Sequence, residues 1–125
     1  MIMHETESVT EVQRHLSVLF LGEQNGKPER ELKSALTMQF KNLGCVDRAY
    51  LVRVRYGGGG VSVALAIAGR PGYRDAVVKG VQTVFSAQFV ADQYVDVMFP
   101  SASVETALSA VCPPFFNSAE RTNID

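Results

Sequence analysis

The chain has 125 residues, of which 46% are hydrophobic and 20% are charged. This size and composition are typical of one globular domain with its own core, and they exclude a disordered or collagen-like chain. Twelve Lys and Arg residues against 13 Asp and Glu give a formal net charge of −1. No strong field would therefore attract nucleic acid or anionic lipid, and we expect neither as a partner.

The cysteines and the N-terminal stretch bear on cellular location. Cys45 and Cys112 are too few and too far apart to indicate a disulfide framework, and no further Cys or His lies at metal-ligand spacing. Residues 1–14 are polar and mixed in charge, unlike a signal peptide. No stretch reaches the roughly 18 apolar residues that span a bilayer. By elimination, we expect a cytoplasmic protein with reduced thiols and no cofactor.

The first half of the chain predicts a strand followed by a helix. We expect residues 1–14 to form a flexible arm and a single domain to occupy residues 15–116. An apolar run over residues 16–21, closed by Gly22, indicates a buried strand. Pro28 suits the first turn of a helix and Gly44 supplies a left-handed stop. Between them an apolar stripe recurs at helical spacing: Leu32, Leu36, Phe40 and Leu43.

Two alternating segments around four glycines predict a β-hairpin. Apolar residues alternate with other residues over 49–56 and again over 61–68, on either side of Gly57–Gly60. We expect the larger apolar residues of both strands to share the core side. The opposite side would then carry Arg53 and Arg55 of the first strand together with the small residues of the second.

The rest of the chain predicts a helix, a strand and a further short helix. Helical spacing runs from Tyr73 to about Gln88, and residues 94–99 form an apolar strand that Pro100 stops. Ser103 can cap a short helix that ends before Pro113, and residues 117–125 form a loose tail. This order indicates an α+β domain of the ferredoxin-like, split βαβ type: βαββαβ plus a C-terminal helix. Its four-stranded antiparallel sheet would carry the main helices on one face.

The other face of that sheet is the first candidate for function. It stays exposed unless the added helix, the N-terminal arm or a partner covers it. A small-residue or apolar face left bare by helices is costly and is usually covered. The candidate interaction face comprises Arg53, Arg55, Ser62, Ala64 and Ala66.

Several residues invite a chemical interpretation, but none forms a catalytic constellation. The run Gly57–Gly60 lacks the Lys-Ser/Thr of a phosphate loop and joins two strands, so a hairpin turn is the better interpretation. His4 and His15 have no partner at the spacing of a triad or metal site. Cys45 and Cys112 resemble small buried hydrophobes, since nothing adjacent would lower their pKa.

Two further patterns bear on catalysis and on RNA binding. Carboxylates at Asp75, Asp92 and Asp96 leave a paired-acid site open, although capping and solvation are more usual roles. Arginines and tyrosines interleave near residues 48–56, as on RNA-binding sheets. The strand over 61–68 has no aromatic residue, however, so a solvated strand face is favoured over base stacking.

The chain resembles the C-terminal domain of the enhanced serine sensitivity protein (SseB) family. The similarity rests on short strings at 20–22, 28–32, 49–52 and 95–99 and on the closing Pro114-Phe115-Phe116, and it covers about residues 16–116. Fuller members of the family have an additional N-terminal domain, and their usual closing Pro-Phe-Tyr is Pro-Phe-Phe here. The resemblance implies no enzyme activity and no catalytic residues.

The sequence therefore favours a non-enzymatic interaction module over the alternatives. We expect it to bind a protein partner or another copy of itself through an open sheet face or edge. The alternative is a domain that senses a small molecule, such as an amino acid, at a subunit interface. An enzyme ranks third, because it would need a cleft that joins Asp75, Asp92 or Asp96 to another titratable group.

Overall fold

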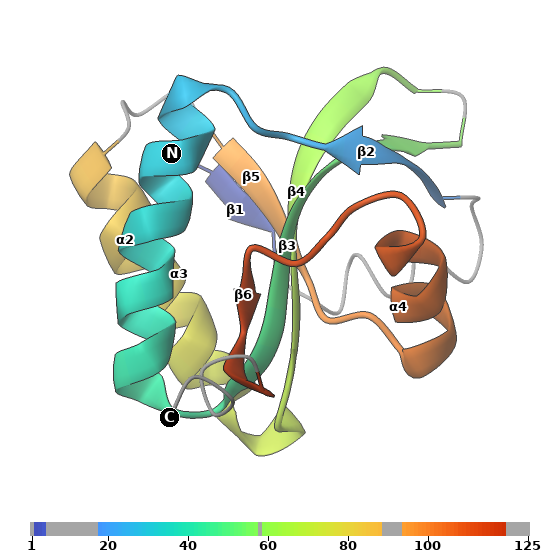
Figure 1. Cartoon of the computed structure of the whole chain (residues 1–125). Helices are drawn as coiled ribbons and strands as arrows, with labels where there is room; N and C mark the ends of the chain where they lie inside the picture. The colour runs from blue at the N-terminus through green and yellow to red at the C-terminus, as the bar shows by residue number, and fades with distance from the viewer. Residues whose placement is uncertain (1, 5–17, 58, 89–93, 120–125) are drawn as a thin grey trace.

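A computed structural model describes residues 2–4, 18–57, 59–88 and 94–119. In this part of the chain a mixed sheet lies between two helices on one face and one helix on the other (Figure 1). The elements are β1 (Ile2–His4), β2 (Val18–Glu23), α2 (Lys27–Leu43), β3 (Val46–Tyr56), β4 (Val61–Gly69), a 3₁₀ turn (Pro71–Tyr73), α3 (Arg74–Gln88), β5 (Tyr94–Met98), α4 (Ala102–Ser109) and β6 (Phe116–Asn117).

The strand order differs from the ferredoxin-like expectation. The sheet runs β1-β5-β4-β3-β2, with β6 also paired to β3. The pairs β2–β3 and β3–β4 are antiparallel, whereas β4–β5 and β1–β5 are parallel. The fold is therefore α+β as expected, but the prediction of a four-stranded antiparallel, split βαβ sheet is wrong. The strands β2, β3, β4 and β5 lie side by side in the order of the sequence. The connections through α2 and α3 each join two neighbouring strands, so neither skips a strand.

The signals that predicted α2 are confirmed. Pro28 lies in the first turn, and Gly44 adopts a left-handed conformation at φ 72°. Its backbone N–H donates to the carbonyl of Phe40 at 3.0 Å, which satisfies one of the last free carbonyls of the helix. The predicted helix from Tyr73 is also present, as the 3₁₀ turn followed by α3.

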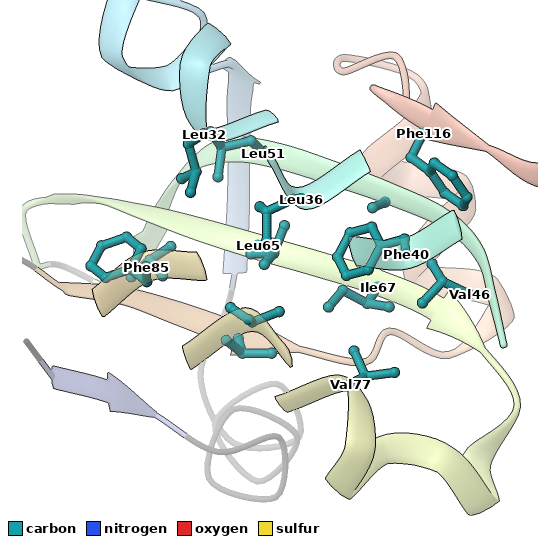
Figure 2. Close-up of a cluster of buried hydrophobic side chains, with 14 of the residues drawn as sticks. Leu32, Leu36, Phe40, Val46, Leu51, Leu65, Ile67, Val77, Phe85 and Phe116 are labelled. Carbon is teal, nitrogen blue, oxygen red and sulfur yellow. The ribbon is translucent and has the colours of Figure 1, made fainter. Parts of the chain in front are cut away.

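The main core lies between the sheet and the pair α2 and α3. Side chains from both helices meet the first face of the sheet, and Figure 2 shows Phe40 among sheet residues with Phe116 nearby. The rings of Phe40 and Phe116 pack edge to face, with centroids 5.7 Å apart. The buried residues of this cluster include Leu32, Leu36, Phe40, Ala49, Leu51, Leu65, Ile67, Val77, Val81, Phe85, Val95 and Val97.

The register of the β3–β4 hairpin overturns the expected division of side chains between the faces. Arg55 pairs with Val61 and Arg53 with Val63, so five residues, 56–60, separate the last pair. With an odd number of residues between them, odd-numbered residues of β3 pair with odd-numbered residues of β4. Residues paired across neighbouring strands point to the same face of the sheet. The two arginines therefore lie on the first face with the larger residues of β4. Ala64 and Ala66 lie on the second face instead.

The second face is covered by α4 over its centre. Tyr50 and Val52 of β3 pack there with Met98 of β5 and with Leu108 of α4, which is fully buried. Ala64 and Ala66 are also fully buried. The expectation of an open face at these alanines is therefore wrong, because the added helix of the same chain fills the space above the small side chains.

The start of α4 corrects a second expectation. Ser101, not Ser103, is the N-cap, and its Oγ accepts a hydrogen bond from the N–H of Val104 at 3.4 Å. The helix ends at Ser109, ahead of the two prolines. No helix in the described segments is both long and apolar enough to cross a membrane.

Both ends of the described chain belong to the sheet. Ile2–His4 pair in parallel with β5, so this part of the predicted flexible arm forms the β1 edge; the rest of the arm lies outside the described residues. At the other end, β6 pairs Phe116 with Ala49 and Asn117 with Arg48. The predicted loose tail therefore begins inside a strand, and its residues 120–125 also lie outside the described part.

Replacing Leu108 by Ala should lower the free energy of unfolding by about 2–5 kcal/mol, because it removes the fully buried anchor of α4. Urea denaturation measures this change. The matched control is Val111→Ala, just beyond the same helix, where the side chain is 46% exposed and the change should stay within about 0.5 kcal/mol. Equal losses in the two variants would contradict the assigned packing of α4.

Candidate functional site at the hairpin end of the sheet

The hairpin end of the sheet has a face that no described helix covers. In Figure 1 the β3–β4 hairpin curves away from α2 and α3 toward the side of α4. There the first face carries a row of opposed residues, Leu19 of β2, Arg55 of β3 and Val61 of β4. Leu19 and Val61 are each 52% exposed, and Arg55 is exposed between them. We call Leu19, Arg53, Arg55 and Val61 the hairpin-end surface.

Arg53 of β3 belongs to the next row of this surface, beside the edge strand β2. It pairs with Gly22, where the register between Phe20 and Gly22 shifts and leaves Leu21 as the extra residue of a β-bulge. Gly22 has a φ of 148°, a conformation that side-chain-bearing residues rarely adopt. A Cβ on Gly22 would lie 3.3 Å from Arg53 Nη2. The glycine therefore leaves room for the guanidinium to lie over β2, at the edge of the sheet.

No described residue neutralises the positive charge of this surface. Neither Arg53 nor Arg55 makes an ion pair or a side-chain hydrogen bond among the described residues. Both are exposed and stand two residues apart on the same face. The arrangement thus combines two unpaired guanidinium groups with two half-exposed aliphatic side chains.

The structure brings together only part of the interaction face expected from the sequence. Arg53 and Arg55 lie in the hairpin-end surface, whereas Ser62, Ala64 and Ala66 lie on the opposite face, and the two alanines are buried. Sequence reasoning missed Leu19 and Val61. Leu19 belongs to a run that resembles a buried strand, but it is exposed because β2 forms the sheet edge and no described helix covers this end of the face.

A polar network on the second face fixes α4 to β3. Arg48 donates two hydrogen bonds to the Glu105 carboxylate, from Nε at 2.5 Å and from Nη2 at 3.0 Å, and the Tyr50 hydroxyl donates to the same carboxylate at 2.6 Å. The hydrogen bonds from Arg48 lower the pKa of Glu105. Burial, followed by the bond to Glu105, raises the pKa of Tyr50 to about 12. All three groups are satisfied, which favours a structural role.

A second tyrosine on this face is placed differently. The Tyr56 hydroxyl is buried near the Asp96 carboxylate, and among the described residues it makes no well-formed hydrogen bond. Burial raises its pKa, and the nearby Asp96 carboxylate raises it further. Asp96 is itself buried at 8% exposure. Of the other carboxylates considered for catalysis, Asp75 lies in the first turn of α3, and Asp92 lies outside the described residues.

A third polar cluster joins α2 to the end of β2. Lys33 of α2 is buried, and its Nζ donates to Glu23 Oε2 at 2.6 Å and to Asn25 Oδ1 at 2.8 Å. Nearby, Cys112 is a free thiol whose pKa burial raises to about 11. A thiol in this state is a poor nucleophile at neutral pH. Cys45 is also a free thiol, and both cysteines are buried, as the sequence predicted.

The described residues contain no group of three or more His, Cys, Asp or Glu side chains placed to hold a metal ion. His4 lies in β1, and His15 lies outside the described residues. The run Gly57–Gly60 joins two antiparallel strands, as a hairpin turn does. The hairpin-end surface therefore stands out as the feature that packing within the described chain leaves unexplained.

Glu105→Gln should lower the free energy of unfolding at pH 7 by about 1–2 kcal/mol, because charged hydrogen bonds become neutral ones. The folded pKa of Glu105 lies below its unfolded value, so this stability is present above the unfolded pKa and is lost as pH falls through the folded pKa. Urea denaturation from pH 7 to pH 3 should show the two proteins converging. A constant difference across that range would contradict the ionised network.

Tyr50→Phe should cost more stability than Tyr56→Phe. The first change leaves the Glu105 carboxylate without one of its donors and should cost about 1–2 kcal/mol. The second removes a buried hydroxyl that lies near the Asp96 carboxylate but makes no well-formed hydrogen bond, so the cost should be smaller. Thermal and urea unfolding of the two variants, each the other's control, measures the order. The reverse order would contradict these assignments.

Comparison of the chain with protein-family models, with curated proteins and with solved structures found no match. The resemblance to the C-terminal domain of the SseB family therefore stays a prediction, and it carries no residue roles into the site described above.

Proposed function

We propose that the chain is a non-enzymatic protein-interaction module that uses the hairpin-end surface and the adjacent edge of β2. The observation that carries this proposal is the row Leu19, Arg55 and Val61, in which aliphatic side chains half exposed to water flank a guanidinium that pairs with no described carboxylate. Burying such a row against a partner removes apolar area from water, at about 25 cal/mol per Å².

Two properties of the surface support a macromolecular partner over a small ligand. The row crosses three neighbouring strands and, beside it, the outer side of β2 has no further strand among the described residues. Extended surfaces with an unpaired strand edge suit protein segments, which supply both side chains and backbone hydrogen bonds. The sensing of a small molecule stays the alternative prediction, and no observation on the described residues favours it.

We propose a cytoplasmic location, and a protein partner or a second copy of the chain as the occupant of the surface. The described residues hold no converging set of acid, base and nucleophile, which supports a binding role over a catalytic one.

Photo-crosslinking tests the proposal without knowing the partner. With p-benzoylphenylalanine in place of Val61, the full chain in its own cells should give a discrete adduct on irradiation, either with itself or with another protein. The control places the same residue at Met38, a side chain 63% exposed on α2. Reversing the charge at Arg53 and Arg55 should reduce the Val61 adduct and leave the control unchanged. Equal labelling at the two positions would overturn the proposal.

A further inference from the structure

The edge strand β2 and the guanidinium that lies over it define a site with its own geometry. On the first face, β2 presents Leu19 at one position and the bare backbone of Gly22 at the next, because the bulged Leu21 separates them. Arg53 Nη2 lies close to Gly22, 3.3 Å from the position that a Cβ on this residue would take. An apolar group and a cation therefore stand next to each other along the outer edge of the sheet.

We infer that this edge receives an extended protein segment with alternating carboxylate and apolar side chains along one face, which pairs with β2 as an additional strand. This inference rests on the proposed function and names the chemistry of the partner. A residue on the added strand lies about 4.5–5.5 Å from the β2 residue opposite it. A carboxylate opposite Gly22 then meets Arg53, and an apolar residue two positions away meets Leu19.

Charge favours an acidic segment over the other occupants. Arg53 and Arg55 have no carboxylate partner among the described residues, so a partner's carboxylate would make a charge-assisted hydrogen bond without displacing an existing one. Pairing β2 with its own copy around Gly22 would instead bring two guanidinium groups to one seam, which disfavours self-association. Single-stranded nucleic acid would need exposed aromatic rings beside the arginines, and the hairpin-end surface has none.

Gly22 determines how far Arg53 reaches. Any side chain at that position would crowd the guanidinium and would also strain a backbone with φ 148°. On an ordinary strand, a residue facing the same side would separate Arg53 from the edge. The bulge and the glycine together therefore convert a surface arginine of β3 into a contact for the strand outside β2.

The test uses the full chain and the labelled peptide acetyl-Val-Thr-Glu-Thr-Val-Thr-Glu-Thr-amide, with a second peptide in which Lys replaces Glu. Fluorescence anisotropy should show tighter binding of the Glu peptide. Arg53→Gln should weaken that binding about tenfold, which corresponds to about 1.4 kcal/mol. Arg53→Glu should reverse the preference and favour the Lys peptide. The control Arg70→Glu changes an exposed arginine outside the surface and should leave binding unchanged.

Amide hydrogen exchange distinguishes strand addition from simple charge attraction. Saturating Glu peptide should slow exchange in β2 and leave α4 unaffected. Far-UV circular dichroism checks that every variant is folded, which is expected since Arg53 is exposed. Equal binding of the two peptides, or no slowing in β2, would overturn the inference.

Other outcomes identify which proposal fails. Suppose that the Val61 adduct forms and depends on the arginines, but the Glu peptide does not bind. This result overturns the inference of an acidic segment and retains the proposed interaction surface. Sedimentation of a dimer that Leu19→Glu dissociates, or oligothymidine binding that requires Arg53, overturns the inference in favour of a second copy or nucleic acid. Loss of both the adduct and the peptide binding overturns the proposed function as well.

Discussion

The register of the β3–β4 hairpin determines where every other layer of the molecule is placed. It sets large residues of β3 opposite small residues of β4 on the second face, with Tyr50 opposite Ala66 and Val52 opposite Ala64. On the first face it sets Leu51 opposite Leu65, and α2 and α3 bury this pair. A shift by one residue would exchange the two faces of one strand and place Arg53 in the position of a core residue. The core under α2 and α3, the position of α4 and the hairpin-end surface therefore all depend on the register of this hairpin.

Two kinds of contact hold α4 on the sheet, the buried side chain of Leu108 and the hydrogen bonds to Glu105. Burial of a side chain such as Leu108 contributes about 1.5–3 kcal/mol, and a hydrogen bond to a charged group adds a net contribution of about 1.5–3 kcal/mol. The apolar contact and the bonds to Glu105 therefore contribute energies of similar size. The bonds from Arg48 and Tyr50 to Glu105 determine where the helix sits, because they satisfy a phenol and a carboxylate that a shifted helix would leave buried and unpaired.

The sequence predicts the individual elements better than their arrangement. The stripe from Leu32 to Leu43 and the stop at Gly44 are local signals, and α2 follows them. The register of the hairpin depends on how many residues the glycine turn contains, and four glycines permit more than one answer. The strand order depends on contacts far apart in the sequence, such as the parallel pairing of β4 and β5, which periodicity does not encode.

The candidate site shows the same limit at the level of single residues. The exposed arginines of β3 are visible in the alternating pattern, but the pattern does not say which residues of β4 and β2 accompany them. Leu19 resembles a core residue in the sequence because it lies in an apolar run. It is exposed because β2 forms the sheet edge and the hairpin end curves beyond α2 and α3 (Figure 1).

An edge strand with an exposed leucine would ordinarily invite unwanted pairing, and natural sheets protect such edges with charges and bulges. Here both devices are present, as Arg53 and the bulge at Leu21, and they act on different partners. The bulge limits the length of regular strand that any segment can pair with. The guanidinium repels a cationic segment and attracts an acidic one, so the feature that protects the edge also selects what binds there. Specificity is a difference between two affinities, and one charge contributes to both.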